Sequence, residues 1–427
     1  MGIQRRGFLK AVAVFGLASL RLRSSWLGAK TAAIVETEGM PARSAAKTYD
    51  VAVVGAGVFG SWTALHLAKA GKNVVLLDAY GPANARASSG GESRVIRAGY
   101  GPDAIYTRWA LRSLTLWKEL FGRSHADLFH NCGVLWLARE QDVYAKQTAA
   151  TLAKSGVKVE HLDRAQMQRR FPQFNFDGVD GALFEPRSGV LMARRAVQAV
   201  VRAAISKGVT YVQAGVKGPA AKGKLESIEL QNGDRISAGQ FIFACGPWLG
   251  KVFPALLGEK IFPSRQEVFF FGVPAGNLQF ASPAMPAWLF FGDEVYGLPD
   301  LENRGFKVAL DRHGERVDPD TLPRIVSKES AEWMRSYVAR RFPALRDAPI
   351  IETRVCQYEN TSNGDFLIDR HPEMENLWLV GGGSGHGFKH GPALGEYVAG
   401  QVSGSGTPAE ARFSFATKQT VQKRAVY

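Results

Sequence analysis

The chain has 427 residues, 46% of them hydrophobic and 22% charged, and its formal net charge is +14. This length suggests two to three domain-sized units, and the composition is that of a globular protein. Residues 1–47 hold eight basic and two acidic residues, so +6 of the net charge lies there. The remaining +8 is spread over the rest of the chain. It forms no basic stripe of the kind that would indicate a nucleic-acid partner.

The first segment with a recognisable pattern is basic and then apolar. Arg5-Arg6-Gly7-Phe8-Leu9-Lys10 fits the twin-arginine export pattern Arg-Arg-x-Phe-Leu-Lys, and a short apolar stretch at 11–20 follows directly. A basic, disordered N-terminus is the alternative, but six consecutive matching positions favour export. We therefore expect the twin-arginine export machinery as a partner and a periplasmic or secreted location.

The next residues predict alternating strands and helices. A β-branched run at 51–54 predicts a parallel strand buried on both faces, residues 61–69 a helix, and residues 74–77 a second strand. Helices are expected at 104–121 and 143–154, and a turn plus helix at 189–207. Asn232-Gly233 predicts a hairpin before a buried strand at 241–244. A helix at 329–341 and a strand at 377–380 precede a Gly-rich turn and a last helix.

These elements predict an α/β fold with two domains. One is a Rossmann-like nucleotide-binding domain, and the other an α+β substrate domain with a mixed antiparallel sheet. Because nucleotide-binding elements lie at both ends of the chain, we expect both domains to be discontinuous. The first is expected to comprise residues 48–125, 188–255 and 350–427, and the second residues 126–187 and 256–349, after a leader and linker at 1–47.

A glycine motif lies between the first strand and the first helix. Gly55, Gly57 and Gly60 form G-x-G-x-x-G, and Asp78 follows 23 residues after Gly55, at the end of the second strand. Gly55 permits the tight turn, Gly57 lets a pyrophosphate approach the helix N-terminus, and Gly60 lets helix and strand pack closely. Asp78 is expected to accept hydrogen bonds from ribose hydroxyls. The motif therefore predicts a dinucleotide site but does not separate NAD from FAD.

Three later segments narrow the choice. They are SSGGESRVIRAGYG at 88–101, VYGLPDLENRGFKVAL at 295–310, and TRVCQYENTSNGDFLIDRHPEMENLWLVGGGSGHGFKHGPALGE at 353–396. With these motifs in this order, residues 49 to about 411 resemble the flavoprotein amine oxidases of the monomeric sarcosine oxidase and N-methyltryptophan oxidase group, in the D-amino-acid-oxidase-like superfamily. The resemblance implies FAD as the cofactor and dioxygen as the electron acceptor.

The resemblance also implies roles for basic residues. Arg94 matches an arginine beside the flavin ring, and Arg97 the arginine that holds the substrate carboxylate. Lys389 matches a lysine near the flavin and that carboxylate. Lys307 matches the lysine that activates dioxygen, where a fixed cation stabilises the negative charge that develops as oxygen accepts an electron.

The remaining matched residues line the same site. Tyr296 and Tyr358 match active-site tyrosines, and Gly383 and Gly385 belong to the Gly-rich run that approaches the flavin edge. Cys356 matches the covalent attachment point of the flavin through an 8α-S-cysteinyl bond. The thiolate is the nucleophile of such a bond, and an arginine such as Arg354 would favour it.

The expected reaction is oxidation of a secondary amine, an N-methyl or cyclic amino acid, to an imine with hydrogen peroxide as second product. Asp311 stands where the family has a histidine, which leaves the particular amine open. Two alternatives remain: a dehydrogenase that passes electrons to a quinone or another carrier, and a flavin-binding sensor without turnover. Three cysteines give no disulfide framework. His386 and His390 lie in a Gly-rich turn without further ligands, so we expect no metal site.

Overall fold

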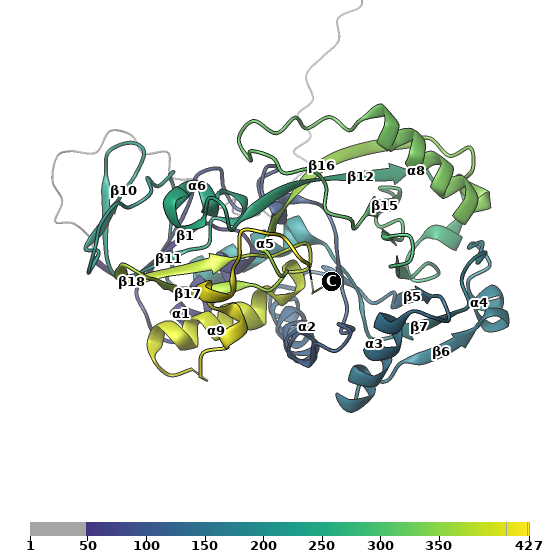
Figure 1. Cartoon of the computed structure of the whole chain (residues 1–427), viewed down its shortest axis with the longest axis horizontal. Helices are drawn as coiled ribbons and strands as arrows, with labels where there is room; N and C mark the ends of the chain where they lie inside the picture. The colour runs from purple at the N-terminus through teal and green to yellow at the C-terminus, as the bar shows by residue number, and fades with distance from the viewer. Residues whose placement is uncertain (1–47, 407, 425, 427) are drawn as a thin grey trace, which may run out of the picture. The chain divides into compact units, whose positions relative to one another are not determined.

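The computed structural model describes residues 48–427 except 407, 425 and 427. The predicted leader at 1–47 lies outside the described residues, so export stays a prediction. Figure 1 shows helices packed around two main sheets, and the predicted α/β fold is confirmed. None of the described helices has the length and hydropathy needed to cross a membrane.

The first sheet has seven strands and is largely parallel. Its path is β17–β18–β11–β1–β2–β9, and β10 pairs with β11. Only β17 and β10 pair antiparallel to their neighbours within it. Residues 51–54 are all buried, as the continuous β-branched run predicts. The bounds are β1 Thr48–Val54, β2 Val74–Asp78, β9 Thr210–Gln213, β10 Ser227–Glu229, β11 Arg235–Phe243, β17 Leu367–His371 and β18 Met374–Gly381.

Helices cover this sheet, and glycines set how closely two of them pack. α1 packs against α9 and α5, and α9 also contacts α2 (Figure 1). A Cβ added to Gly395 of α9 would lie 2.7 Å from the backbone nitrogen of Thr63 in α1, so this close packing requires a glycine. The bounds are α1 Val58–Lys69, α2 Ala104–Ser124, α5 Ala193–Ser206 and α9 Gly391–Ser403.

The second sheet has eight strands in the order β16–β12–β15–β14–β13–β5–β7–β6. All neighbours pair antiparallel except β13 and β5, which gives the mixed sheet expected from the sequence. α8 packs against β12 (Figure 1), over a core rich in phenylalanine. The bounds are β5 Val134–Ala138, β6 Glu160–Asp163, β7 Gly181–Glu185, β12 Phe262–Phe271, β13 Ala287–Phe290, β14 Val295–Leu298, β15 Phe306–Leu310, β16 Ile350–Asn360, α3 Val143–Lys154, α4 Arg164–Arg170 and α8 Lys328–Arg341.

One segment belongs to a different sheet from the one its predicted domain implies. Residues 350–427 were expected to join the nucleotide-binding part, but β16 pairs along β12 in the eight-stranded sheet. The assignment of all other domain segments stays a prediction. A third, small sheet is antiparallel and has the strand order β3–β8–β4. The remaining short elements are β3 Arg94–Ile96, β4 Phe129–His130, β8 Gly189–Leu191, α6 Leu249–Val252 and α7 Pro254–Leu257.

Candidate active site

The glycine motif forms the turn between β1 and α1, and each glycine has a distinct steric surrounding. Gly55 has φ +107°, and a Cβ there would lie 2.3 Å from the carbonyl oxygen of Ala244. A Cβ on Gly60 would lie 1.9 Å from the carbonyl oxygen of Gly55. A Cβ on Gly57 would meet only Ser89 Oγ, at 3.6 Å, so the backbone there is open to the neighbouring cavity. The turn is thus closed on the protein side and open on the cavity side.

Asp78, at the end of β2, holds this turn in place. Its Oδ2 accepts the backbone N–H of Ala56 at 2.8 Å, and its Oδ1 accepts that of Tyr80 at 2.9 Å. Burial raises the pKa of Asp78 above its usual range. Asp78 also lines the cavity, so its predicted contact with ribose hydroxyls is compatible with this bracing role. The bracing was not anticipated from the motif.

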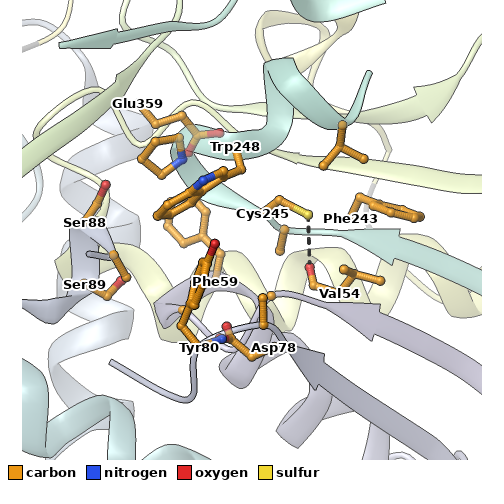
Figure 2. A pocket seen from close by; sticks show the side chains of 18 of the residues that line it. Val54, Phe59, Asp78, Tyr80, Ser88, Ser89, Phe243, Cys245, Trp248 and Glu359 are labelled. Carbon is orange, nitrogen blue, oxygen red and sulfur yellow. Dashed lines mark hydrogen bonds between the residues drawn. The ribbon is translucent and has the colours of Figure 1, made fainter. Parts of the chain in front are cut away.

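A cavity of about 400 Å³, here called the larger cavity, begins at Asp78 and the glycine turn and reaches Tyr358, Gly383 and Gly385. Figure 2 shows Tyr80 and Trp248 side by side in it, with their rings 5.9 Å apart. Sequence patterns do not indicate this aromatic pair, because the two residues are distant in the chain. The cavity therefore joins the nucleotide turn to the residues expected near a flavin.

A second cavity of about 90 Å³, here called the smaller cavity, adjoins the first. Arg94, Tyr358 and Gly385 line both. Six basic and three acidic side chains line the smaller cavity: Arg94, Arg97, Lys307, Arg354, Lys389 and Arg424, with Glu92, Glu267 and Asp311. All six predicted catalytic residues, and Cys356, line this cavity.

The acidic residues of the smaller cavity are each paired with an arginine. Glu92 binds Arg354 at 2.9 Å, Glu267 binds Arg265 at 2.6 Å, and Asp311 binds Arg424 at 3.2 Å. In the part of the chain that the structure describes, Arg94, Lys307 and Lys389 form no ion pair with a carboxylate. The lining therefore holds more basic than acidic side chains, which favours an anionic ligand.

Arg97 and Lys389 come from segments far apart in sequence and are both buried. The Arg97 guanidinium lies between two rings, 4.4 Å from that of Tyr100 and 4.7 Å from that of Trp136. Lys389 Nζ donates to the Tyr100 hydroxyl at 2.8 Å and to the His386 carbonyl at 2.9 Å. Burial, and then the charge of Arg97, lower the pKa of Lys389 well below its usual range.

A hydrogen-bond chain behind Lys389 was not foreseen from the sequence. The Tyr100 hydroxyl joins Lys389 Nζ to His390 Nε2, which lies 2.7 Å from the hydroxyl. Burial holds the pKa of His390 well below its usual range, so the neutral imidazole is the stable form. His386 also adjoins this network: its Nδ1 lies 3.4 Å from the Tyr100 hydroxyl, and its Nε2 lies 2.9 Å from the Gly364 carbonyl oxygen. Among the described residues no group of three or more metal-ligating side chains occurs.

Lys307 lies on β15 and is only 3% exposed. Its Nζ donates to the Ser93 carbonyl at 3.0 Å and lies 5.9 Å from the centre of the Tyr296 ring. Burial, and then the charge of Arg94, lower the pKa of Lys307 to about 7. A buried ammonium group next to an arginine is unfavourable for folding, so its presence indicates a functional role.

Cys356 lies on β16, and the arginine at its sulfur is Arg94. Arg94 Nη2 is 3.6 Å from Cys356 Sγ. Arg354, the arginine proposed for this position from the sequence, instead binds Glu92 at 2.9 Å and also pairs with Glu352. Its charge is therefore directed to carboxylates, and Arg94 takes the place beside the thiol.

The two tyrosines stay uncharged. Burial raises the pKa of Tyr296 to about 12, and it raises that of Tyr358 far above its usual range. Tyr358 also limits its neighbour Gly385, where φ is +80° and an added Cβ would lie 2.7 Å from the Tyr358 ring. At Gly383 the nearest atom to an added Cβ is 3.8 Å away, on Phe59. The Gly-rich turn before α9 thus leaves its backbone close to both cavities.

Comparisons with known proteins agree with this site. The family described as FAD dependent oxidoreductase (DAO) matches residues 50–401. Monomeric sarcosine oxidase from Bacillus sp. (strain B-0618) is 30% identical over 362 residues, which is 82% of this chain and 91% of the relative. N-methyl-L-tryptophan oxidase from Yersinia pestis (strain Pestoides F) is 27% identical over 363 residues, 82% of this chain and 94% of the relative.

A comparison of folds finds a solved structure with a similar fold. The crystal structure of L-proline dehydrogenase from P. horikoshii superposes with a TM-score of 0.77 at 21% identity, covering 87% of this chain and 97% of that one. The residues present fit FAD, because the backbone at Gly57 is open to the larger cavity at the start of α1, where free N–H groups favour a pyrophosphate. The chain therefore belongs to the family of FAD-dependent oxidoreductases and uses FAD as its cofactor.

Proposed function

We propose that this protein is an oxidase of a small secondary amine that carries a carboxylate, an N-methyl or cyclic amino acid, and that it produces an imine and hydrogen peroxide. The observation that carries the proposal is the cluster of basic side chains around the smaller cavity, next to the larger cavity. The names of the relatives, sarcosine oxidase and N-methyl-L-tryptophan oxidase, support the amine as the oxidised group.

Cavity size supports a small substrate. The smaller cavity has a volume of about 90 Å³, against about 400 Å³ for the larger cavity. N-methylglycine and ring amino acids such as proline or pipecolate suit this space better than glycated amino acids. We expect a panel of these substrates to give the highest kcat/KM with the smallest members.

Four residues that line the smaller cavity act on the substrate in this proposal. Arg97 and Lys389 bind the substrate carboxylate through charge-assisted hydrogen bonds. This contact fixes the carbon next to nitrogen in a reactive orientation. FAD, when bound, accepts a hydride equivalent from that carbon. Tyr296 and Tyr358, both uncharged, shape the walls and offer hydroxyl groups without adding charge.

Lys307 is proposed to assist the reaction with dioxygen. It is a fixed, buried amine, and its protonated form would stabilise negative charge that develops on oxygen. A dehydrogenase that passes electrons to a quinone or another carrier is the second candidate function of the same site, and a flavin-binding sensor is the third. Peroxide formation measured against dye reduction separates the first two. If no amine of the panel reduces the flavin without oxygen, the sensor is correct.

We also propose that Cys356 binds the flavin covalently, with Arg94 stabilising the attacking thiolate. Wild-type protein precipitated by acid should stay yellow, and Cys356→Ala should release its flavin into the supernatant. The matched control is Cys132→Ala, which removes a buried thiol that lines neither cavity. Release of flavin from the wild type would exclude the covalent bond.

Export in folded form is proposed from residues 5–10. FAD is bound during folding in the cytoplasm, and the twin-arginine route carries folded proteins, so such a leader suits a flavoprotein. Replacing Arg5 and Arg6 with lysine should leave a yellow, active enzyme in the cytoplasm. An unchanged location of the double variant would show that the leader does not direct export.

A further inference from the structure

A pair of charged side chains in the smaller cavity does not act on the substrate or on dioxygen in the proposal above. Arg424 lines this cavity, although the family model matches only residues 50–401. Its partner Asp311 lines the cavity too, at a position where the sarcosine oxidase group has a histidine. The pair is therefore a feature of this chain that membership of the family does not explain.

Arg424 lies in an irregular segment that is attached to the loop after β16. The backbone N–H of Lys423 donates to the carbonyl oxygen of Ser362 in that loop. Val426 is 1% exposed and contacts the same loop, where a Cβ added to Gly364 would lie 3.1 Å from the Val426 carbonyl oxygen. The segment is therefore held to the protein on both sides of Arg424.

The side chain of Arg424 is itself held at three nitrogen atoms. Its Nη2 lies 3.2 Å from the Asp311 carboxylate, and its Nη1 donates to the Asp311 carbonyl oxygen at 3.2 Å. Its Nε donates to the Val426 carbonyl oxygen at 3.0 Å. The side chains of Arg424 and Asp311 are 13% and 19% exposed. Because several hydrogen bonds fix the planar guanidinium, Arg424 forms a fixed wall of the cavity and not a mobile surface side chain.

The pair lies close to the group proposed to hold the substrate carboxylate. Burial and then the charge of Arg97 lower the pKa of Lys389, and Asp311 and Arg424 are further charges that act on it. The cavity that these side chains share has a volume of only about 90 Å³. In a cavity of this size a fixed wall excludes a larger substrate, because a well-packed site cannot take up an extra methylene group without strain.

We propose that Arg424, held in place by Asp311, limits the size of the amino acid that the smaller cavity accepts. Its side chain occupies space that a larger substituent on the nitrogen or on the α carbon of the substrate needs. Arg424 is thus a specificity-determining residue, supplied by a segment outside the family match. The inference rests on the proposed function, since it presupposes an amino acid with a secondary amine as the substrate.

The test is anaerobic reduction of the full-length, FAD-loaded enzyme by N-methylglycine, N-ethylglycine and N-methylleucine. Flavin absorbance gives a second-order rate constant for each substrate, whichever electron acceptor the enzyme uses. Arg424→Ala should raise the rate constant of at least one larger substrate, relative to N-methylglycine, by about tenfold or more, as expected for space worth one methylene group. Arg424→Gln, a shorter polar side chain, is the second variant and should shift the ratio in the same direction. The flavin content of each variant shows that it is folded.

Two controls separate size from charge and from damage to the segment. Arg424→Met keeps a long side chain without the charge, so its ratios should stay within about threefold of the wild type. Gln422→Ala removes a contact of 3.1 Å between Gln422 Nε2 and His313 Nδ1, two residues from Arg424, and Gln422 lines neither cavity. It should leave the ratios unchanged.

The possible failures are distinguishable. Reduction of the wild type by N-methylglycine, with unchanged ratios in Arg424→Ala and Arg424→Gln, would overturn the role of Arg424 and leave the proposed function intact. A shift in Arg424→Met as large as in Arg424→Ala would overturn the role of size. An equal shift in Gln422→Ala would overturn the assignment to Arg424. No reduction of the wild type by any amino acid of the series would overturn the proposed function itself.

Discussion

Lys307 gives the sharpest prediction, because its pKa of about 7 lies within the working pH range. A lysine with this pKa is protonated to about 90% at pH 6 and about 10% at pH 8. If the ammonium form assists the reaction with dioxygen, the rate at which the reduced enzyme reacts with oxygen should fall about ninefold over these two units. The assay is stopped-flow mixing of substrate-reduced enzyme with oxygenated buffer across this range.

Lys307→Met removes the cation and should make the oxygen reaction slow and independent of pH. A unit charge about 4 Å from a developing anion contributes up to about 4 kcal/mol at an effective dielectric constant near 20, which limits the loss to roughly a thousandfold. Anaerobic reduction by substrate should change much less. Unchanged oxygen rates in Lys307→Met, or a flat pH profile in the wild type, would refute the role of the ammonium group.

The free energy of unfolding shows whether Lys307→Met acts through the lost charge or through damage to the fold. The pKa of Lys307 is about 7 in the folded protein and about 10.5 in the unfolded chain. Between these two pH values the unfolded chain binds more protons than the folded protein. The contribution of Lys307 to the free energy of unfolding therefore rises with pH in this range. Below pH 7 the buried charge opposes folding, so Lys307→Met should be more stable than the wild type at pH 6. Lys418→Met is the matched control: Lys418 is also buried, with its pKa lowered to about 8, but lines neither cavity.

Three further predictions follow from the same geometry. Gly60→Ala should abolish FAD binding or folding, because its Cβ would lie 1.9 Å from a carbonyl oxygen. Gly122→Ala, at an exposed position of α2, should instead raise the free energy of unfolding by about 0.5–1 kcal/mol; denaturant titration measures both. Lys389→Met should raise KM for carboxylate substrates by about 10–100-fold, the loss of one charge-assisted hydrogen bond, with the oxygen reaction unchanged. His390→Phe should shift the pH dependence of KM, because it removes the partner of the Tyr100 hydroxyl, and should leave the pH dependence of the oxygen reaction unaltered.

Local patterns predicted the parts of the fold that local physics determines. The β-branched run at 51–54 and the glycine turn became β1 and the start of α1, and the helix expected at 143–154 has these bounds in the structure. Hydrophobic period and glycine spacing act over a few residues, so a single sequence carries them. The sheet to which β16 belongs could not be predicted from such local patterns, because β16 pairs with β12, which lies about 90 residues away in the sequence.

The site shows the same limit more clearly. Arg354 and Cys356 are two residues apart on one strand, so alternation places both on one face and favours Arg354 as the partner of the sulfur. The structure directs Arg354 to Glu92 and Glu352, and Arg94 reaches the sulfur from 262 positions away in the sequence. Which of two eligible arginines contacts a thiol depends on where the carboxylates lie, and carboxylates from other segments cannot be located from spacing alone.

The two buried lysines of the smaller cavity are both proposed to act in the protonated form, and they reach it by different routes. Burial lowers the pKa of Lys389 and of Lys307. A bound substrate carboxylate would place a negative charge beside Lys389 and raise its pKa again, so binding takes up a proton and affinity falls as pH rises. Lys307 is separately anchored to the Ser93 carbonyl and keeps its own equilibrium near pH 7. The Tyr100–His390 chain contacts Lys389, whereas Lys307 donates to Ser93, so the protonation of Lys389 and that of Lys307 can be tuned independently within one small cavity.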